Sequence, residues 1–187
     1  MSTNLLEEIE KYQEKYYLQT KKNTFFKNSQ KIDCATKLCS EFNKTELIEK
    51  TLYIIPNTNK VYINYPMFKL YANPDLYNEI VEKLLELLIH CINTFGDFEC
   101  HINLNTFTIT AANRYKQVIE LFCEKCFKNE TKYSTVLSKL YIYNSPGMIE
   151  SISRVFLHLI DPQVRSKIVL FNKSESDGKL NTLLVYE

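Results

Sequence analysis

Residues 139–171 read KLYIYNSPGMIESISRVFLHLIDPQVRSKIVLF, and this stretch decides the fold. The apolar run at 140–143 predicts a strand, and Asn-Ser-Pro-Gly at 144–147 predicts the turn that ends it. Apolar side chains then recur at helical spacing over 148–160, which predicts an amphipathic helix closed by Asp-Pro. A second strand follows at 168–171. Strand, helix and strand in this order predict a right-handed crossover between parallel strands.

The same alternation of elements extends toward the N-terminus. Residues 99–110 alternate in the manner of a strand, and residues 111–127 place their apolar side chains on one helical face. Before them, Asn73–Pro74–Asp75 opens a long helix, and Gly96 ends it. These elements favour an α/β fold with a mainly parallel β-sheet covered by helices.

A hairpin precedes this core. The runs 52–55 and 61–65 are rich in β-formers, and the turn residues Pro56–Asn57–Thr58–Asn59 separate them. Pro66 ends the second strand because proline cannot donate to a ladder. At the other end of the chain, the apolar run 180–186 is interpreted as a strand or a docked tail.

The N-terminal part has a different character. Between Leu5 and Tyr17 an apolar stripe recurs at helical spacing among charged residues, which predicts a helix that docks on the rest of the chain. Residues 21–50 are interpreted as a connector, with a short helix around 34–42 left open. We therefore divide the chain into an N-terminal helical segment with a connector, residues 1–49, and an α/β domain, residues 50–187.

Composition excludes several classes of protein. The chain has 187 residues and 45% apolar side chains, and its 23 basic and 22 acidic residues leave a net charge of +1. These values exclude general disorder and a broad nucleic-acid-binding face, and only 3 glycines leave little for a glycine-built phosphate cradle. No apolar run approaches the roughly 18 residues of a bilayer span, and the charged N-terminus lacks a signal peptide. We expect an intracellular, cytoplasmic protein without a nucleic-acid partner.

The cysteines and histidines predict no catalytic or metal site. Cys123 and Cys126 form a CxxC near the end of a predicted helix and lack a second closely spaced pair, which favours core thiols and leaves zinc as the alternative. The three histidines, His90, His101 and His158, lie in no nucleophile elbow or HExxH motif. We therefore expect no enzyme activity, no metal and no cofactor. A hydrolase or redox enzyme stays open as a weaker alternative.

Residues 139–171 also resemble the second half of the CRAL-TRIO domain. The shared pattern consists of Asn144–Ser145–Pro146 after a strand, Leu159–Ile160–Asp161–Pro162 at the end of a helix, and Lys167–Ile168 at the entry to the next strand. Looser similarity reaches back to about residue 50. The chain is similar to this family in a divergent and shortened form, of the type found in the yeast phosphatidylinositol transfer proteins.

The resemblance implies non-enzymatic binding, and transfer, of a lipid or other hydrophobic molecule in an internal pocket. It implies that Thr108 and Thr110 contact the ligand headgroup from a strand. It also implies that Lys167 neutralises a phosphate, as in phosphoinositide-binding members. The residues expected to line the pocket, from the helices over 74–95 and 148–160, are Leu84, Leu88, Ile152 and Phe156.

Two departures from the family pattern favour a second hypothesis. Thr135 stands where phosphoinositide-binding members have a glutamate. After the last strand, residues 172–178 and a short apolar run replace the family's gate helix. The alternative function is therefore a ligand-free protein-interaction module, of the divergent CRAL-TRIO type found with Rho GTPase-activating proteins, whose partner is another protein.

Peripheral membrane contact is a further expectation, and it concerns the connector. Lys21, Lys22, Lys27 and Lys31 suit anionic lipid headgroups, at about 1 kcal/mol each. The same lysines also serve simply to keep a connector soluble. The sequence leaves both interpretations open.

Overall fold

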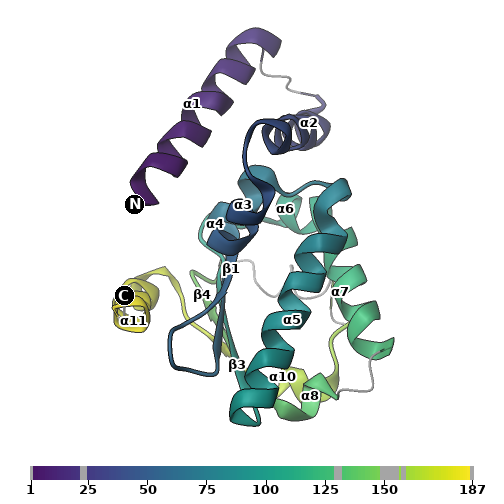
Figure 1. The fold of residues 1–187 in the computed structure, drawn as a ribbon, viewed down its shortest axis with the longest axis vertical. Helices are drawn as coiled ribbons and strands as arrows, with labels where there is room; N and C mark the ends of the chain where they lie inside the picture. The colour runs from purple at the N-terminus through teal and green to yellow at the C-terminus, as the bar shows by residue number, and fades with distance from the viewer. Residues whose placement is uncertain (1, 22–24, 129–131, 148–155, 157–158, 186–187) are drawn as a thin grey trace.

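The computed structural model describes residues 2–21, 25–128, 132–147, 156 and 159–185. Its centre is a five-stranded sheet in which neighbouring strands are consecutive along the chain (Figure 1). The strands are β1 (Leu52–Ile54), β2 (Lys60–Asn64), β3 (Phe98–Asn103), β4 (Leu137–Tyr143) and β5 (Ile168–Leu170). β1 runs antiparallel to β2, and the other three pairs are parallel. The predicted α/β fold with a mainly parallel sheet is confirmed.

The hairpin of β1 and β2 forms where the turn residues predict it. Leu52 pairs with Ile63 and Ile54 pairs with Val61. The turn is closed by a hydrogen bond in which the Ile55 amide donates to the Lys60 carbonyl at 2.9 Å. β2 ends before Pro66, as expected, and α4 (Tyr65–Tyr71) begins there with that proline in its first turn.

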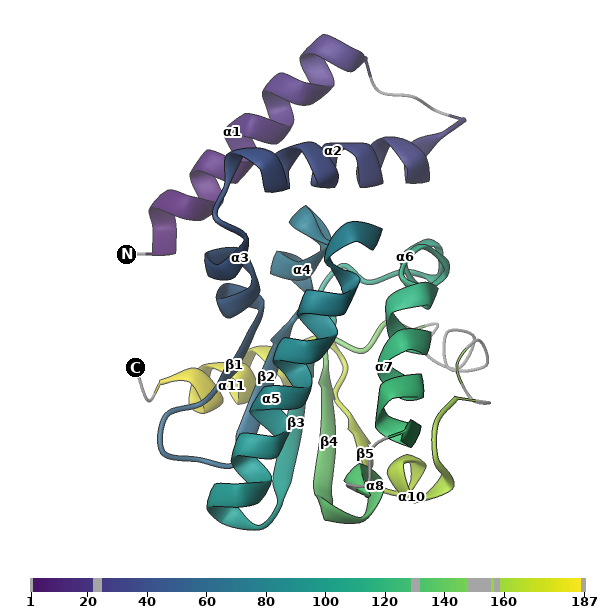
Figure 2. The same ribbon diagram turned by 45° about the vertical axis from the view of Figure 1, so that its right-hand side comes forward.

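One face of the sheet, the aliphatic face, is built from Ile54, Val61, Cys100 and Leu140. It packs against α5 (Tyr77–Phe95) and α7 (Lys116–Lys128), which lie side by side over it (Figure 2). α5 follows the short helix η1 (Pro74–Leu76). Asn73 caps that start, since its side chain accepts from the Asp75 amide at 3.1 Å. Gly96 ends α5 at φ +87°, in the left-handed region that glycine adopts without strain. The helix predicted from Asn73 to Phe95 is confirmed.

The N-terminal part is more helical than the sequence predicts. α1 (Ser2–Thr20) confirms the first helix, but residues 21–50 are not a connector, because they contain α2 (Lys27–Glu41) and α3 (Lys44–Thr51). α2 buries Cys34, Ala35, Leu38 and Cys39, so small and sulfur-bearing side chains supply its apolar stripe. The polar pair Asn43–Lys44 does not mark a loop. Asn43 caps α3 by accepting from the amides of Thr45 and Glu46.

The N-terminal helices share one buried cluster with the helices of the α/β part. Ile9, Leu38 and Leu47 pack in the same cluster as Tyr71 and Val81. The boundary between residues 49 and 50 stays a prediction. None of the described helices combines the length and the apolar character that crossing a bilayer requires.

The strand predicted over 99–110 is too long. β3 ends at Asn103, and the chain then turns through Thr106, which has a φ of +67°. The predicted helix over 111–127 consists of two helices, α6 (Ile109–Arg114) and α7, which meet at Tyr115. Two single-turn helices flank the last strands, namely α8 (Tyr133–Val136) and α10 (Pro162–Arg165).

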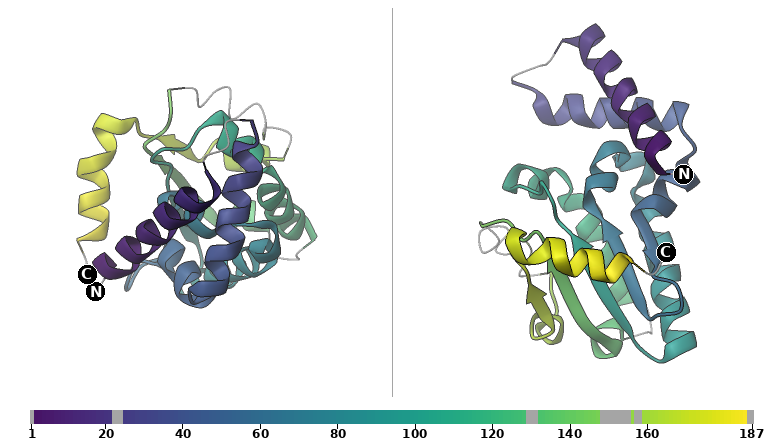
Figure 3. Two further views of the ribbon diagram at one scale, coloured as in Figure 1. Left: turned by 90° about the horizontal axis from the view of Figure 1, so that it is seen from above. Right: turned by 90° about the vertical axis from the view of Figure 1, so that its left-hand side faces the viewer.

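The segment near the end of the chain is a helix, α11 (Lys173–Leu184), so the strand alternative is wrong, whereas the docked alternative agrees with the burial of Leu180 and Leu183 against the sheet. A capping box starts it. The Asn172 side chain accepts from the Glu175 amide at 3.1 Å, and the Glu175 carboxylate accepts from the Asn172 amide at 3.0 Å. α11 crosses the face of the sheet opposite to α5 and α7 (Figure 3). The helix predicted over 148–160 lies mostly outside the described residues.

Candidate functional site

Six ring side chains gather on the side of the sheet that α11 crosses, and we call them the aromatic face. They are Tyr53, Tyr62, His101, Tyr141, Tyr143 and Phe171. The strand register sets Tyr53, Tyr62, His101 and Tyr141 opposite one another across four strands. Ring centroids lie 5.2 Å apart between Tyr53 and Tyr62 and 4.8 Å apart between His101 and Tyr141. The two faces of the sheet therefore differ. One is aliphatic, and the other is aromatic with the titratable side chain of His101 between Tyr62 and Tyr141.

His101 is held by two hydrogen bonds. Its Nε2 lies 3.2 Å from Glu99 Oε2, and its Nδ1 lies 2.9 Å from the Tyr143 hydroxyl. Because a carboxylate only accepts, Nε2 carries the proton, and Nδ1 of the neutral ring accepts from Tyr143. The side chain is 3% exposed. Burial lowers the pKa of His101, and the neighbouring Glu99 carboxylate only partly offsets this shift.

The hydroxyl of Tyr143 is equally constrained. Burial raises the pKa of Tyr143 to about 12, so its hydroxyl stays protonated and donates to His101. The Tyr143 ring is tilted against the Phe171 ring, with centroids 5.3 Å apart. Glu99, His101 and Tyr143 form one hydrogen-bonded chain that runs from β3 to β4 within the aromatic face.

α11 covers part of this face with few side chains. Leu180 and Leu183 are buried against Tyr62 and Tyr143, and Lys179 Nζ lies 4.5 Å from the centroid of the Phe171 ring. The helix is also tied to β4, because the Asn144 amide donates to Ser176 Oγ at 2.6 Å. Tyr141 and Phe171 stay half-buried beside the helix. An apolar group of a ligand can pack on such rings, while the Glu99–His101–Tyr143 chain supplies polar partners.

Thr108 and Thr110, predicted on a strand near a headgroup, lie elsewhere. Thr108 is the N-cap of α6, and its Oγ1 accepts from the Ala111 amide at 3.2 Å. Thr110 lies within α6 and is exposed. The strand assignment is wrong because β3 stops at Asn103, where the loop to α6 begins. A headgroup role for either threonine stays a prediction.

Lys167, predicted to neutralise a phosphate, donates to three backbone carbonyls. Its Nζ lies 2.8 Å from Ser134 O, 3.2 Å from Thr135 O and 2.5 Å from Leu137 O. An ammonium group has three protons, so all of them point to the end of α8. The lysine therefore closes this helix and joins it to β5, and a phosphate would compete with those carbonyls.

We expect Lys167→Met to lower the free energy of unfolding by about 1–2 kcal/mol, because the half-buried carbonyls lose a charged donor. Urea unfolding measures the change. The control is Lys139→Met, which removes an exposed lysine from β4. Unchanged stability with selective loss of phosphorylated lipids would instead support the predicted headgroup role.

The predicted pocket residues are distributed over several clusters. Leu84 and Leu88 of α5 pack into the core between that helix and the aliphatic face. Phe156 is buried in a small cluster with Ala112, whereas Ile152 lies outside the described residues. The described residues of the predicted pocket, between the helices and the sheet, therefore pack in hydrophobic clusters. Their role in lining a pocket stays a prediction.

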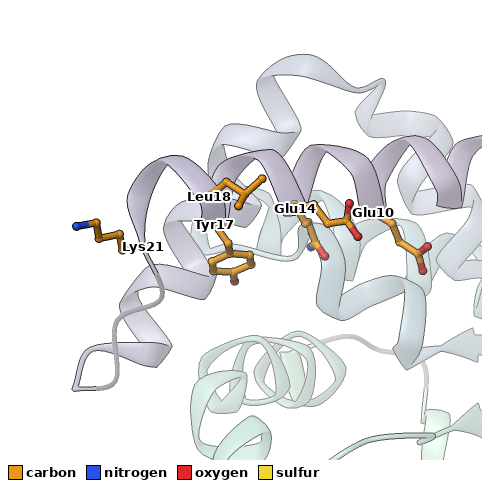
Figure 4. Close-up of a pocket in the computed structure, with 6 residues that line it drawn as sticks. Glu10, Glu14, Tyr17, Leu18 and Lys21 are labelled. Atoms are coloured by element: carbon orange, nitrogen blue, oxygen red, sulfur yellow. The ribbon is translucent and has the colours of Figure 1, made fainter.

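Two hollows are described, and both lie on the outside of the helices. The larger, of about 810 Å³, runs along α1 and is lined by residues that include Glu14, Tyr17, Leu18 and Lys21 (Figure 4). The smaller, of about 240 Å³, lies between α3 and α5 and is lined by acidic side chains, Lys83 and Ile48. Neither hollow touches the aromatic face.

The cysteines lie in apolar surroundings. Burial raises the pKa of Cys91 to about 11 and the pKa values of Cys100 and Cys126 to about 12. These thiols are therefore protonated at neutral pH and poor nucleophiles. Among the described residues, no group of three or more His, Cys, Asp or Glu side chains has the arrangement of a metal site.

The chain is also similar to a known protein family. A family model described as the CRAL/TRIO domain matches residues 72–184, which is more than half of the chain. The matched region contains β3, β4, β5 and α11. None of the curated proteins matches the chain.

Proposed function

The chain belongs to the CRAL/TRIO domain family, and from this premise we propose that it binds a lipophilic small molecule on its aromatic face, beneath α11. Membership of this family suggests binding or transfer of such ligands. The observation that carries the location is the pairing of a ring-lined sheet face with one helix that buries only a few leucines on it. In the proposed complex, acyl or other apolar groups take the place of those leucines.

The energetics of this exchange are favourable. A ligand gains about 0.8 kcal/mol for each methylene removed from water, so an acyl chain readily exceeds the contribution of two leucines. Both protons of the Glu99–His101–Tyr143 chain are used within it, so it offers a polar end of the ligand acceptors only, on the Glu99 carboxylate and the Tyr143 hydroxyl oxygen. The proposed activity is binding and exchange, without a chemical step.

The more specific expectations that the family resemblance raises are also proposals. They are a likeness to the yeast phosphatidylinositol transfer proteins and transfer between membranes. Recognition of a phosphoinositide through Lys167 is an alternative, which selective loss of phosphorylated lipids in Lys167→Met would support. A cytoplasmic location is supported by six cysteines that are all free thiols, as expected in a reducing compartment.

Mass spectrometry of bound lipid tests the proposal. The purified protein is denatured and extracted with organic solvent, and we expect one lipophilic molecule per chain. Leu183→Asp places a charge at the contact of α11 with Tyr62 and Tyr143, and we expect about tenfold less extracted ligand. Thr182→Asp adds the same charge at the adjacent exposed position and should retain the ligand.

An empty protein would favour the second function. Leu180 and Leu183 already cover Tyr62 and Tyr143, as a ligand-free interaction module requires. In that case Leu183→Asp and Thr182→Asp would extract equally little lipid, and the proposed ligand site would be wrong. Equal lipid content in both variants would also exclude the aromatic face as the site.

A further inference from the structure

Three exposed apolar side chains lie at the end of α1 and just before the start of α2. Leu18 is 82% exposed, Phe25 is 92% exposed and Phe26 is 67% exposed. Together with Lys21 and Lys27, which are also exposed, we call them the helical tip. Exposed aromatic side chains gathered at one place are typical of an interaction surface.

Positive charge predominates around this tip, although Glu10 and Glu14 line the same hollow as Leu18 and Lys21. Residues 15–32 contain five lysines and no acidic residue, although the whole chain has a net charge of only +1. The first carboxylate that follows, Asp33, is already neutralised. The Tyr16 hydroxyl donates to its Oδ2 at 2.5 Å, and Lys37 Nζ lies 2.9 Å from the same oxygen. The tip therefore presents the exposed lysines Lys21 and Lys27 beside apolar rings.

The tip is held in place by hydrogen bonds. Gln30 Nε2 donates to the Lys21 carbonyl at 2.7 Å, which joins the start of α2 to the end of α1. In the first turn of α2, Asn28 Oδ1 accepts two hydrogen bonds from the Arg114 guanidinium, at 2.7 and 3.0 Å. These bonds link α2 to α6. The two helices that flank the rings are therefore tied to each other and to α6.

We propose that the helical tip docks the protein on an anionic lipid bilayer. Phe25 and Phe26 then lie at the boundary between headgroups and acyl chains, and Lys21 and Lys27 contact anionic headgroups. The tip protrudes from the end of the molecule farthest from the C-terminal end of α5 (Figures 1 and 2). The open hollow along α1 shares Leu18 and Lys21 with this surface (Figure 4).

The charge pattern favours an anionic bilayer over a second copy of the chain. A second copy of the chain would bring a tip of the same charge against this one, which is repulsive. A flat anionic surface accommodates both the separated lysines and the two rings. This proposal goes beyond ligand binding and does not depend on it, because docking through the tip requires no cargo.

Vesicle flotation of the full chain tests the proposal. We expect binding to vesicles of phosphatidylcholine with phosphatidylserine, and much weaker binding to phosphatidylcholine alone. Lys21→Glu with Lys27→Glu should weaken binding by about fivefold per lysine or more, and added salt should do the same. Phe25→Ser with Phe26→Ser should weaken it by about tenfold per ring.

Matched variants elsewhere on the molecule keep the test specific. Phe95→Ser removes another exposed ring, at the end of α5, and Lys44→Glu with Lys173→Glu reverses two exposed lysines in the first turns of helices. These controls should bind as the wild type does. The proposal is overturned if the wild type does not float with anionic vesicles, or if tip and control variants bind equally. Loss of self-association in the tip variants, without any vesicle binding, would also overturn it.

Lipid extraction separates this proposal from the ligand site. The tip variants should contain as much extracted lipid as the wild type, because the tip is remote from the aromatic face. Leu183→Asp should in turn float normally. If either variant loses both properties, the two surfaces are not independent and the tip proposal is wrong.

Discussion

Replacement of Leu88 by alanine is expected to lower the free energy of unfolding by about 2–5 kcal/mol, the largest loss for any single change considered. Leu88 lies in α5 and is 2% exposed. It packs with Cys91 and Val61 between the helix and the aliphatic face. Alanine removes the side-chain contacts and leaves a cavity that rigid strands cannot fill by moving.

Ile89→Ala is the matched control. Ile89 is the next residue of α5 and is 38% exposed, so its loss should cost less than about 1 kcal/mol. Urea unfolding of both variants measures the two changes under the same conditions. A loss for Leu88→Ala as small as that for Ile89→Ala would contradict the packing of this core.

The same variant decides between two roles of Leu88. A core leucine affects stability and leaves the bound lipid unchanged in amount and composition. A leucine that lines a ligand pocket is replaced at little cost, because the ligand or solvent already faces it, and the bound lipids then shift toward larger ones. We expect the first outcome. The second would place the ligand between α5 and the sheet, and it would contradict the aromatic face as the site.

The elements around the crossovers could be predicted because their local signals agree with the tertiary fold. The helix from Asn73 to Gly96 has a wide apolar band, a capping asparagine and a terminal glycine, and the structure uses all three. β4 was found from the run 140–143, although it starts earlier, at Leu137. Strand ends are set by pairing with neighbouring strands, which local sequence does not encode.

The helices that were missed, or left open as around residues 34–42, have weak apolar patterns. α2 buries alanine and cysteines, and α11 contains Gly178 and many polar residues, so neither shows a clear apolar stripe. α2 has no side-chain cap, since Phe26 stands at its N-cap, but the capping residues of α11 and α3 are visible in the sequence. Asn172 with Glu175, three residues later, is a capping box, and Asn43 precedes α3 in the same way. Tertiary contacts supply the rest of their stability.

The candidate site was harder to predict than the fold. Tyr62, His101 and Tyr141 are far apart in sequence and meet only through the register of three strands. The available signal was the alternation of Tyr141 and Tyr143, which places both rings on one side of their strand. His101 was interpreted only as a residue without a catalytic motif, since the sequence gives neither its burial nor its partners.

Acidification should destabilise the protein through His101. Burial lowers the pKa of His101 below its ordinary value near 6.5, so the unfolded chain binds a proton more readily than the folded one. Stability therefore rises with pH in the window between the folded pKa and 6.5, and it is lost as the pH falls below 6.5. At its steepest, this dependence is about 1.4 kcal/mol per pH unit for one group.

The groups around His101 determine how well the charge is tolerated. Glu99 on the same strand stabilises the imidazolium, whereas Lys60 on β2 opposes it. Protonation also turns Nδ1 into a donor that faces the Tyr143 hydroxyl, which must then rotate to accept. The buried side chains of α11 are Ser176, Leu180 and Leu183, and none of them carries a charge to compensate.

Urea unfolding between about pH 7.5 and pH 5 measures this dependence. His101→Gln keeps hydrogen-bonding capacity and cannot titrate, so we expect its stability to be flat over that range. Tyr143→Phe should keep the slope, because it leaves the histidine buried beside Glu99. An equal slope in wild type and His101→Gln would assign the loss to another group. Since the charge would form beneath α11, a steep wild-type slope should be accompanied by release of any ligand bound there.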